Sequence, residues 1–135
     1  LTANIANNKI TVEAAEIVTP VMLTKTLVSD KNGLTFTWTL ANQVTPGTTV
    51  KGSLKITGSL AAGTTSDTTV TLADAGSTGI SGIKWVAKNA TDNGCSATGA
   101  VLTIPNTFAT DANGATINFE FDVAASSTAP AIKAD

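Results

Sequence analysis

The stretch Thr116-Ile117-Asn118-Phe119-Glu120-Phe121-Asp122-Val123 alternates strictly between polar and apolar residues. Successive side chains of a strand face opposite sides of a sheet, so the pattern predicts one buried and one hydrated face. Two of the chain's four phenylalanines lie on the apolar side. The usual setting for such a strand is an antiparallel sheet that covers one side of a two-layer core.

The stretch Leu34–Leu40 shows the same alternation, with three threonines on its polar side. We expect its apolar face to lie opposite Phe119 and Phe121 across the core. Turn signals separate several shorter segments with alternating or apolar character, and no helical periodicity persists beyond two turns. The sequence therefore predicts an all-β protein, an antiparallel immunoglobulin-like β-sandwich, with a partly closed barrel as the alternative. The further expected strands are 9–18, 21–28, 50–60, 68–72, 83–87 and 101–104.

A chain of 135 residues is long enough for one domain with its own core. We divide it into an N-terminal arm at 1–18, a sandwich domain at 19–125 and an extended C-terminal tail at 126–135. The tail is rich in Ala, Ser, Thr and Pro, which is typical of linkers. Because the sequence begins at Leu1 instead of Met, we expect that a signal peptide has been removed.

The composition excludes several classes of function. There are 25 threonines but no Arg, His or Tyr, only 13% of residues are charged, and the net charge is −2. Nucleic-acid binding lacks an electrostatic basis, and the absence of His removes the commonest general base and metal ligand. No apolar run approaches the roughly 20 residues of a transmembrane helix. Such a charge-poor, Thr-rich chain resembles secreted and cell-surface proteins.

Carboxylates and one short motif are the candidates for catalysis. Glu120 and Asp122 share a strand face, as a glycosidase pair would, and Glu13 with Glu16 is a second pair. A hydrated sheet face that discourages edge pairing is the favoured interpretation. Ser81-Gly82-Ile83-Lys84 fits S-x-x-K, but that motif requires a helix. We expect a strand here, in which residues three apart face opposite sides, so no enzymatic activity is predicted.

Asp30-x-Asn32-Gly33 and Asp111-x-Asn113-Gly114 are similar to the opening of a calcium loop, yet the later ligands of that loop are missing. Hairpin turns explain both segments without a metal, and we expect no cofactor. Asn89-Ala90-Thr91 is a formal glycosylation acceptor.

Three further side chains could lie either in the core or on the surface. For Trp38 and Trp85 we favour core packing over stacking on a sugar, because both lie on apolar strand faces. For Cys95 we favour a thiol buried under its loop over an exposed thiol or a disulfide with another chain.

The chain as a whole resembles secreted immunoglobulin-like subunits of prokaryotic surface filaments, notably pilins joined by donor-strand exchange, including chaperone–usher fimbrial subunits. The resemblance rests on the arm 1–8, the alternation of Ile10, Val12 and Ala14 that follows it, and the final strand with Phe119 and Phe121. The segment 99–125 also looks like a DUF11-type repeat of surface proteins.

The resemblance implies a non-enzymatic, extracellular filament subunit that polymerises with copies of itself. In such families the N-terminal extension of one subunit completes the sheet of its neighbour. The side chains that would dock on the neighbour would each contribute about 1–2 kcal/mol where they are large. The donor-strand candidates are Ile5, Ile10, Val12, Ala14 and Ile17.

Two alternatives stay open. Residues 9–18 would otherwise be the first strand of the chain's own sandwich. The protein would otherwise be a monomeric cell-surface module that binds a carbohydrate or a host protein through the loops Ala61–Asp67 and Lys88–Gly99.

Overall fold

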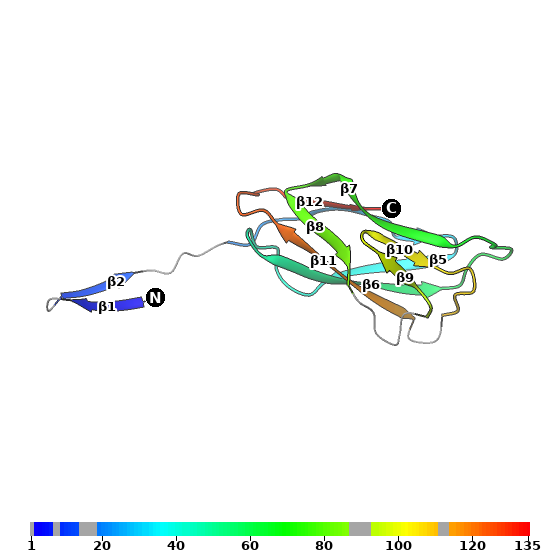
Figure 1. Ribbon diagram of the computed structural model, residues 1–135, viewed down its shortest axis with the longest axis horizontal. Helices are drawn as coiled ribbons and strands as arrows, with labels where there is room; N and C mark the ends of the chain where they lie inside the picture. The colour runs from blue at the N-terminus through cyan, green and yellow to red at the C-terminus, as the bar shows by residue number, and fades with distance from the viewer. Residues whose placement is uncertain (1, 7–8, 14–18, 87–92, 111–113) are drawn as a thin grey trace.

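Two five-stranded sheets pack against each other, and a two-stranded hairpin precedes them (Figure 1). The structure is a computed structural model that describes residues 2–6, 9–13, 19–86, 93–110 and 114–135. The predicted all-β sandwich is confirmed. In spatial order, the first sheet comprises β3 (Thr24–Leu27), β12 (Ala131–Ala134), β7 (Thr68–Thr78), β10 (Val101–Ile104) and β9 (Ser96–Thr98). The second comprises β4 (Asp30–Lys31), β5 (Leu34–Leu40), β6 (Thr49–Gly58), β11 (Ala115–Val123) and β8 (Ile80–Trp85).

Strand β11 has the two faces that its alternation predicts. Phe119 and Phe121 are at most 2% exposed, whereas Asn118 and Asp122 are exposed. The strand lies between β6 and β8 and pairs antiparallel with both. Its apolar face therefore forms the centre of the core on the side of the second sheet. The core extends to buried residues of the first sheet: Val70, Leu72, Leu102, Ile104, Ile132 and Ala134.

The expectation that the apolar face of β5 opposes β11 across the core is wrong. Both strands belong to the second sheet and flank β6, so their apolar residues lie side by side. Gly52 of β6 is paired with Phe119 and leaves room for the aromatic ring: a Cβ atom there would lie 2.5 Å from Phe119 Cζ. The rings of Trp38 and Phe119 approach to 5.6 Å between centroids. Alternation identifies the buried face of a strand, but not the sheet to which the strand belongs.

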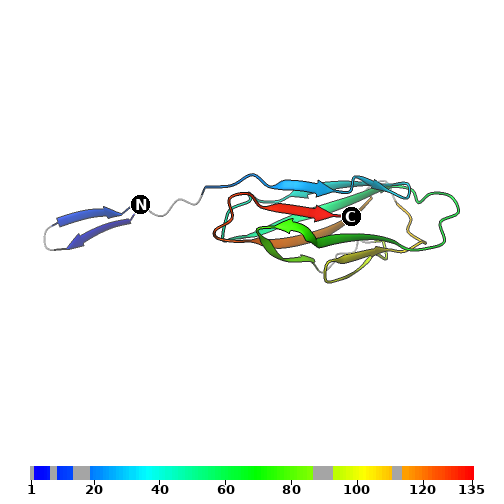
Figure 2. The ribbon, with the colours of Figure 1, turned by 90° about the horizontal axis from the view of Figure 1, so that it is seen from above.

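The C-terminal segment also differs from the expected extended tail, because β12 lies inside the first sheet (Figure 2). It pairs parallel with β3 and antiparallel with β7, which makes this sheet mixed instead of purely antiparallel. Ile132 and Ala134 are each 2% exposed. A strand of four residues is too short for a periodic pattern to outweigh the Ala/Ser/Thr/Pro composition around it.

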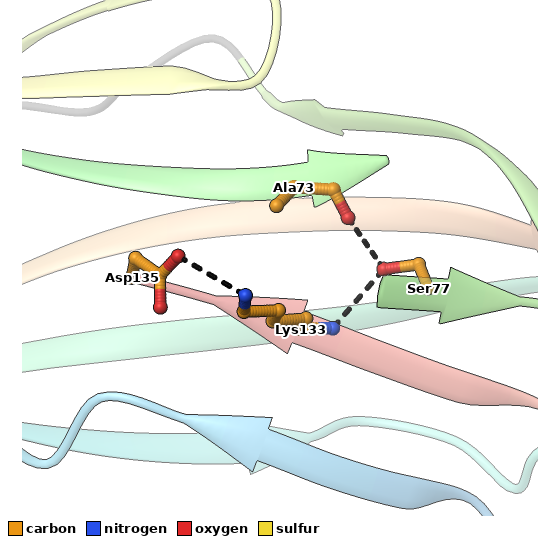
Figure 3. Close-up of polar contacts among 4 residues, drawn as sticks. All are labelled: Ala73, Ser77, Lys133 and Asp135. Carbon is orange, nitrogen blue, oxygen red and sulfur yellow. Dashed lines mark hydrogen bonds and ion pairs between the residues drawn. The ribbon is translucent and has the colours of Figure 1, made fainter. Parts of the chain in front are cut away.

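Strand β7 is interrupted by a bulge that one hydroxyl group stabilises (Figure 3). Ala131 pairs with Thr78, but Lys133 pairs with Ala73, so the two strands lose their regular register between these pairs. The Ser77 hydroxyl donates a hydrogen bond to the Ala73 carbonyl at 2.5 Å and accepts one from the Lys133 N–H at 3.1 Å. The side chain thus replaces ladder partners that the bulge removes.

Candidate functional site

Three of the residues expected to dock on a neighbour, Ile5, Ile10 and Val12, lie in a hairpin formed by β1 (Thr2–Ala6) and β2 (Lys9–Glu13). The antiparallel register pairs Ile5 with Ile10 and Ala3 with Val12. Directly paired residues share a face of the sheet, so these four positions occupy one face. The pairing of the arm with β2 was not predicted from the sequence. The sequence feature that could have indicated this pairing is Asn7-Asn8, which lies between two short alternating segments.

The hairpin stands apart from the packed sheets in both views (Figures 1 and 2). Among the residues that the structure describes, β2 pairs with β1 and with no strand of the sandwich. The alternative in which residues 9–18 form the first strand of the chain's own sandwich therefore does not hold for Lys9–Glu13. The candidates Ala14 and Ile17 lie outside the described residues.

The hairpin has no third strand among the described residues. Two strands without further support are marginally stable in water, and stability requires a third strand or an apolar surface against which the hairpin can pack. Ile5, Ile10 and Val12 share one face of this hairpin, and within the described residues both of its outer edges carry backbone groups without a ladder partner. These are the features that strand addition to another molecule would satisfy.

The outer face of the second sheet holds the candidate carboxylates, and each has a partner there. Lys84 Nζ lies 3.3 Å from Glu120 Oε1, and the Thr49 hydroxyl donates to Asp122 Oδ1 at 2.6 Å. These contacts are those of a hydrated sheet face. The second carboxylate pair, Glu13 with Glu16, is only partly described, since residue 16 lies outside the described ranges.

The whole S-x-x-K segment is part of strand β8 (Ile80–Trp85), although the strand was expected to begin only at residue 83. Side chains do not alternate regularly between the two faces along this segment. The ladder places Ser81 opposite Asp122 and Lys84 opposite Glu120. Since Glu120 and Asp122 share the outer face, so do Ser81 and Lys84. The register shift of a bulge causes this, and Gly82 in the bulge has a φ of +61°.

The first of the two calcium-like segments is a hairpin turn. Asn32 and Gly33 have φ values of +53° and +85° and connect β4 to β5, as expected for a two-residue hairpin loop. In the second segment, residues 111–113 lie outside the described part of the chain, as does the acceptor Asn89.

Trp85 belongs to the buried core, and Trp38 packs against it. Trp85 is 6% exposed and Trp38 is half-buried, with their ring centroids 5.9 Å apart. Their indole N–H groups donate to carbonyl oxygens, that of Trp38 to Val28 at 2.8 Å and that of Trp85 to Ala100 at 3.0 Å. Cys95 is 1% exposed. The preference for structural roles is confirmed for these three side chains.

A hollow of about 400 Å³ opens beyond the end of β6, between segments 59–64 and 106–110. The loop Ala61–Asp67, predicted as a binding loop, contributes one wall. The other wall follows β10 and was not predicted, although Pro105-Asn106 is a sequence signal for a turn. The second predicted loop, Lys88–Gly99, is described only from residue 93 onward.

Within the described ranges, no helix has the length and apolar character needed to cross a bilayer. The fold and the separate hairpin define the chain as a two-sheet β-sandwich with an appended β-hairpin. Comparison with known proteins adds no relative, since no family model, curated protein or solved structure matches the chain.

Proposed function

We propose that this protein is a non-enzymatic structural subunit of an extracellular filament, in which subunits are joined by donation of β-structure. The hairpin Thr2–Glu13 of one copy docks on the sandwich of the next copy. The observation that carries the proposal is that the hairpin has apolar positions on one face and pairs with no strand of the described sandwich.

Physical reasoning supports donation of the hairpin to a neighbouring copy over a hairpin that contacts no other molecule. A sandwich that is open at its edges presents unpaired N–H and C=O groups, and an added strand satisfies them. A contact between the hairpin of one copy and the sandwich of another is heterologous, so it repeats without closing and produces a filament. The chain needs no cofactor for this role.

The test is the assembly state of hairpin variants, measured by light scattering and negative-stain electron microscopy. Ile5→Asp and Ile10→Asp each place a charge on the apolar face, and we expect both to abolish filaments because the charge would have to be buried on docking. Thr11→Asp is the matched control, since position 11 lies on the opposite face of the same strand, and its filaments should persist.

Filaments in the Ile5→Asp and Ile10→Asp variants equal to those of the unmodified chain would contradict the proposal. A strictly monomeric unmodified chain would contradict it too, and would favour the second candidate, a monomeric surface-binding module. The hollow beside Ala61–Asp67 is the observation that favours this second candidate.

A further inference from the structure

The hollow between segments 59–64 and 106–110 has walls that hydrogen bonds hold in place. The backbone N–H of Asn106 donates to Asp67 Oδ1 at 3.0 Å, and its side-chain amide donates to the Thr65 carbonyl at 2.7 Å. These two bonds join the loops on either side of the hollow. A preformed wall lowers the entropy that a ligand must overcome on binding.

A threonine hydroxyl also makes a hydrogen bond in each of the two loops. The Thr64 hydroxyl donates to the Ala61 carbonyl at 2.5 Å, within the first loop. The Thr110 hydroxyl donates to the Gly58 carbonyl at the end of β6. Each hydroxyl oxygen keeps acceptor capacity for a further hydrogen bond. The Thr110 bond thus anchors the second loop to β6 and the Thr64 bond closes a turn within the first loop, while polar oxygens remain along the hollow.

The lining is uncharged and has both polar and apolar parts. None of the described residues that line the hollow carries a charge. The hydroxyls of Ser59 and Thr107 are on exposed residues and bond to no described protein group. Leu60 is half-buried and Phe108 is 7% exposed, so together they supply an apolar portion. Hydroxyls both donate and accept, as a neutral polyhydroxyl ligand requires.

We propose that this hollow binds a neutral carbohydrate, with one or two sugar units inside it. A sugar presents hydroxyls to Ser59, Thr107 and Asn106, and C–H groups to the apolar portion. The volume is within the usual range of small-molecule sites, about 300–1,000 Å³. An anionic sugar would find no cation among the described lining residues. The site does not depend on whether the protein forms filaments.

The experiment is saturation-transfer difference NMR on the full chain, which works for monomers and filaments alike. The probes are the methyl glycosides of glucose, galactose, mannose and N-acetylglucosamine, with glucuronic acid as the anionic comparison. We expect transfer to at least one neutral glycoside at tens of millimolar and none to glucuronic acid.

The variant Thr107→Val removes one ligand hydroxyl partner and keeps the side-chain shape. It should raise the dissociation constant about fivefold, the effect of losing one hydrogen bond of about 1 kcal/mol. Thr37→Val, on the exposed face of β5, is the control and should bind as the unmodified chain does. The proposal is overturned by absence of transfer to all four neutral glycosides, by equal transfer to glucuronic acid, or by unchanged affinity in Thr107→Val.

Discussion

At the scale of single residues, Gly52 shows how the aromatic part of the core fits together. It is buried in the middle of β6, and a Cβ atom there would lie 2.5 Å from Phe119 Cζ and 2.7 Å from the Thr39 carbonyl oxygen. Phe119 in turn contacts both tryptophans, at 5.6 and 5.9 Å between ring centroids. The missing side chain of Gly52 thus allows rings from three strands to meet.

We predict that Gly52→Ala destabilises the sandwich by about 1–3 kcal/mol, as overpacking of a filled core does. Urea denaturation followed by tryptophan fluorescence measures the change. Ser53→Ala, one residue further on the outer face, is the control and should remain within about 0.5 kcal/mol of the unmodified chain. An equal free energy of unfolding for both variants would show that the aromatic cluster does not require a glycine here.

Ser77 is the second residue with a specific prediction. Ser77→Ala leaves the half-buried Lys133 N–H without its acceptor, and we expect a loss of about 1–2 kcal/mol in the free energy of unfolding. Ser77→Thr keeps the hydroxyl and should recover part of that loss. Ser29→Ala removes only an exposed hydrogen bond to Asp30 and serves as the control. If both alanine variants unfold at the same urea concentration, the bulge does not depend on the hydroxyl.

At the scale of elements, the two ends of the chain have opposite relations to the sandwich. Strand β12 lies between β3 and β7 and places Ile132 and Ala134 in the core, whereas the hairpin β1–β2 pairs with no described sandwich strand. The C-terminal strand is therefore part of the folding unit, and the hairpin is an addition to it.

Two truncations test this difference. We predict that removal of residues 131–135 eliminates cooperative urea unfolding, because it opens the core, leaves β3 without its strand partner and exposes one edge of β7. Removal of residues 1–13 should leave the urea midpoint within error, measured at concentrations where the chain is dispersed. A cooperative transition in the first truncation, or a lowered midpoint in the second, would contradict this division.

The strands with long alternating patterns were predictable from the sequence because one face of each is buried. The clearest are β5 and β11, in which apolar residues recur at every second position. Their common sheet was not predictable, because strand order depends on long-range pairing that alternation does not encode. Strand β12 was missed because Ile132 and Ala134 alone form no period.

For the candidate site, the sequence placed the docking candidates near the N-terminus but did not predict that three of them lie in a hairpin. Ile5, Ile10 and Val12 were expected on an arm followed by a strand, and the register shows that they belong to two paired strands. One wall of the hollow, the loop Ala61–Asp67, was predicted because it has the composition of a flexible loop. The other wall, segment 106–110, was not predicted, because the path of β10 brings it close to that loop. Hydrogen bonds such as that of Asn106 to Thr65 join residues distant in sequence.

At the scale of the whole molecule, the chain combines a packed sandwich with a hairpin that the proposed assembly docks on another copy. Each copy carries one hairpin and one sandwich, so a chain of copies satisfies every hairpin except the terminal one. Lys9 is the only lysine among residues 1–13, and the sandwich carries lysines on both sheets, such as Lys25 and Lys51. Lys9 can therefore report where the hairpin docks.

The most direct measurement is amine cross-linking of a co-assembled mixture of ¹⁵N-labelled and unlabelled chains, followed by mass spectrometry. If the hairpin docks on a neighbouring copy, Lys9 should be cross-linked to lysines of the sandwich. Cross-links between a labelled and an unlabelled peptide should then occur as often as random mixing of the two kinds of chain predicts. Cross-links from Lys9 that join only peptides of the same isotopic composition would place the hairpin on its own sandwich and contradict the proposed assembly.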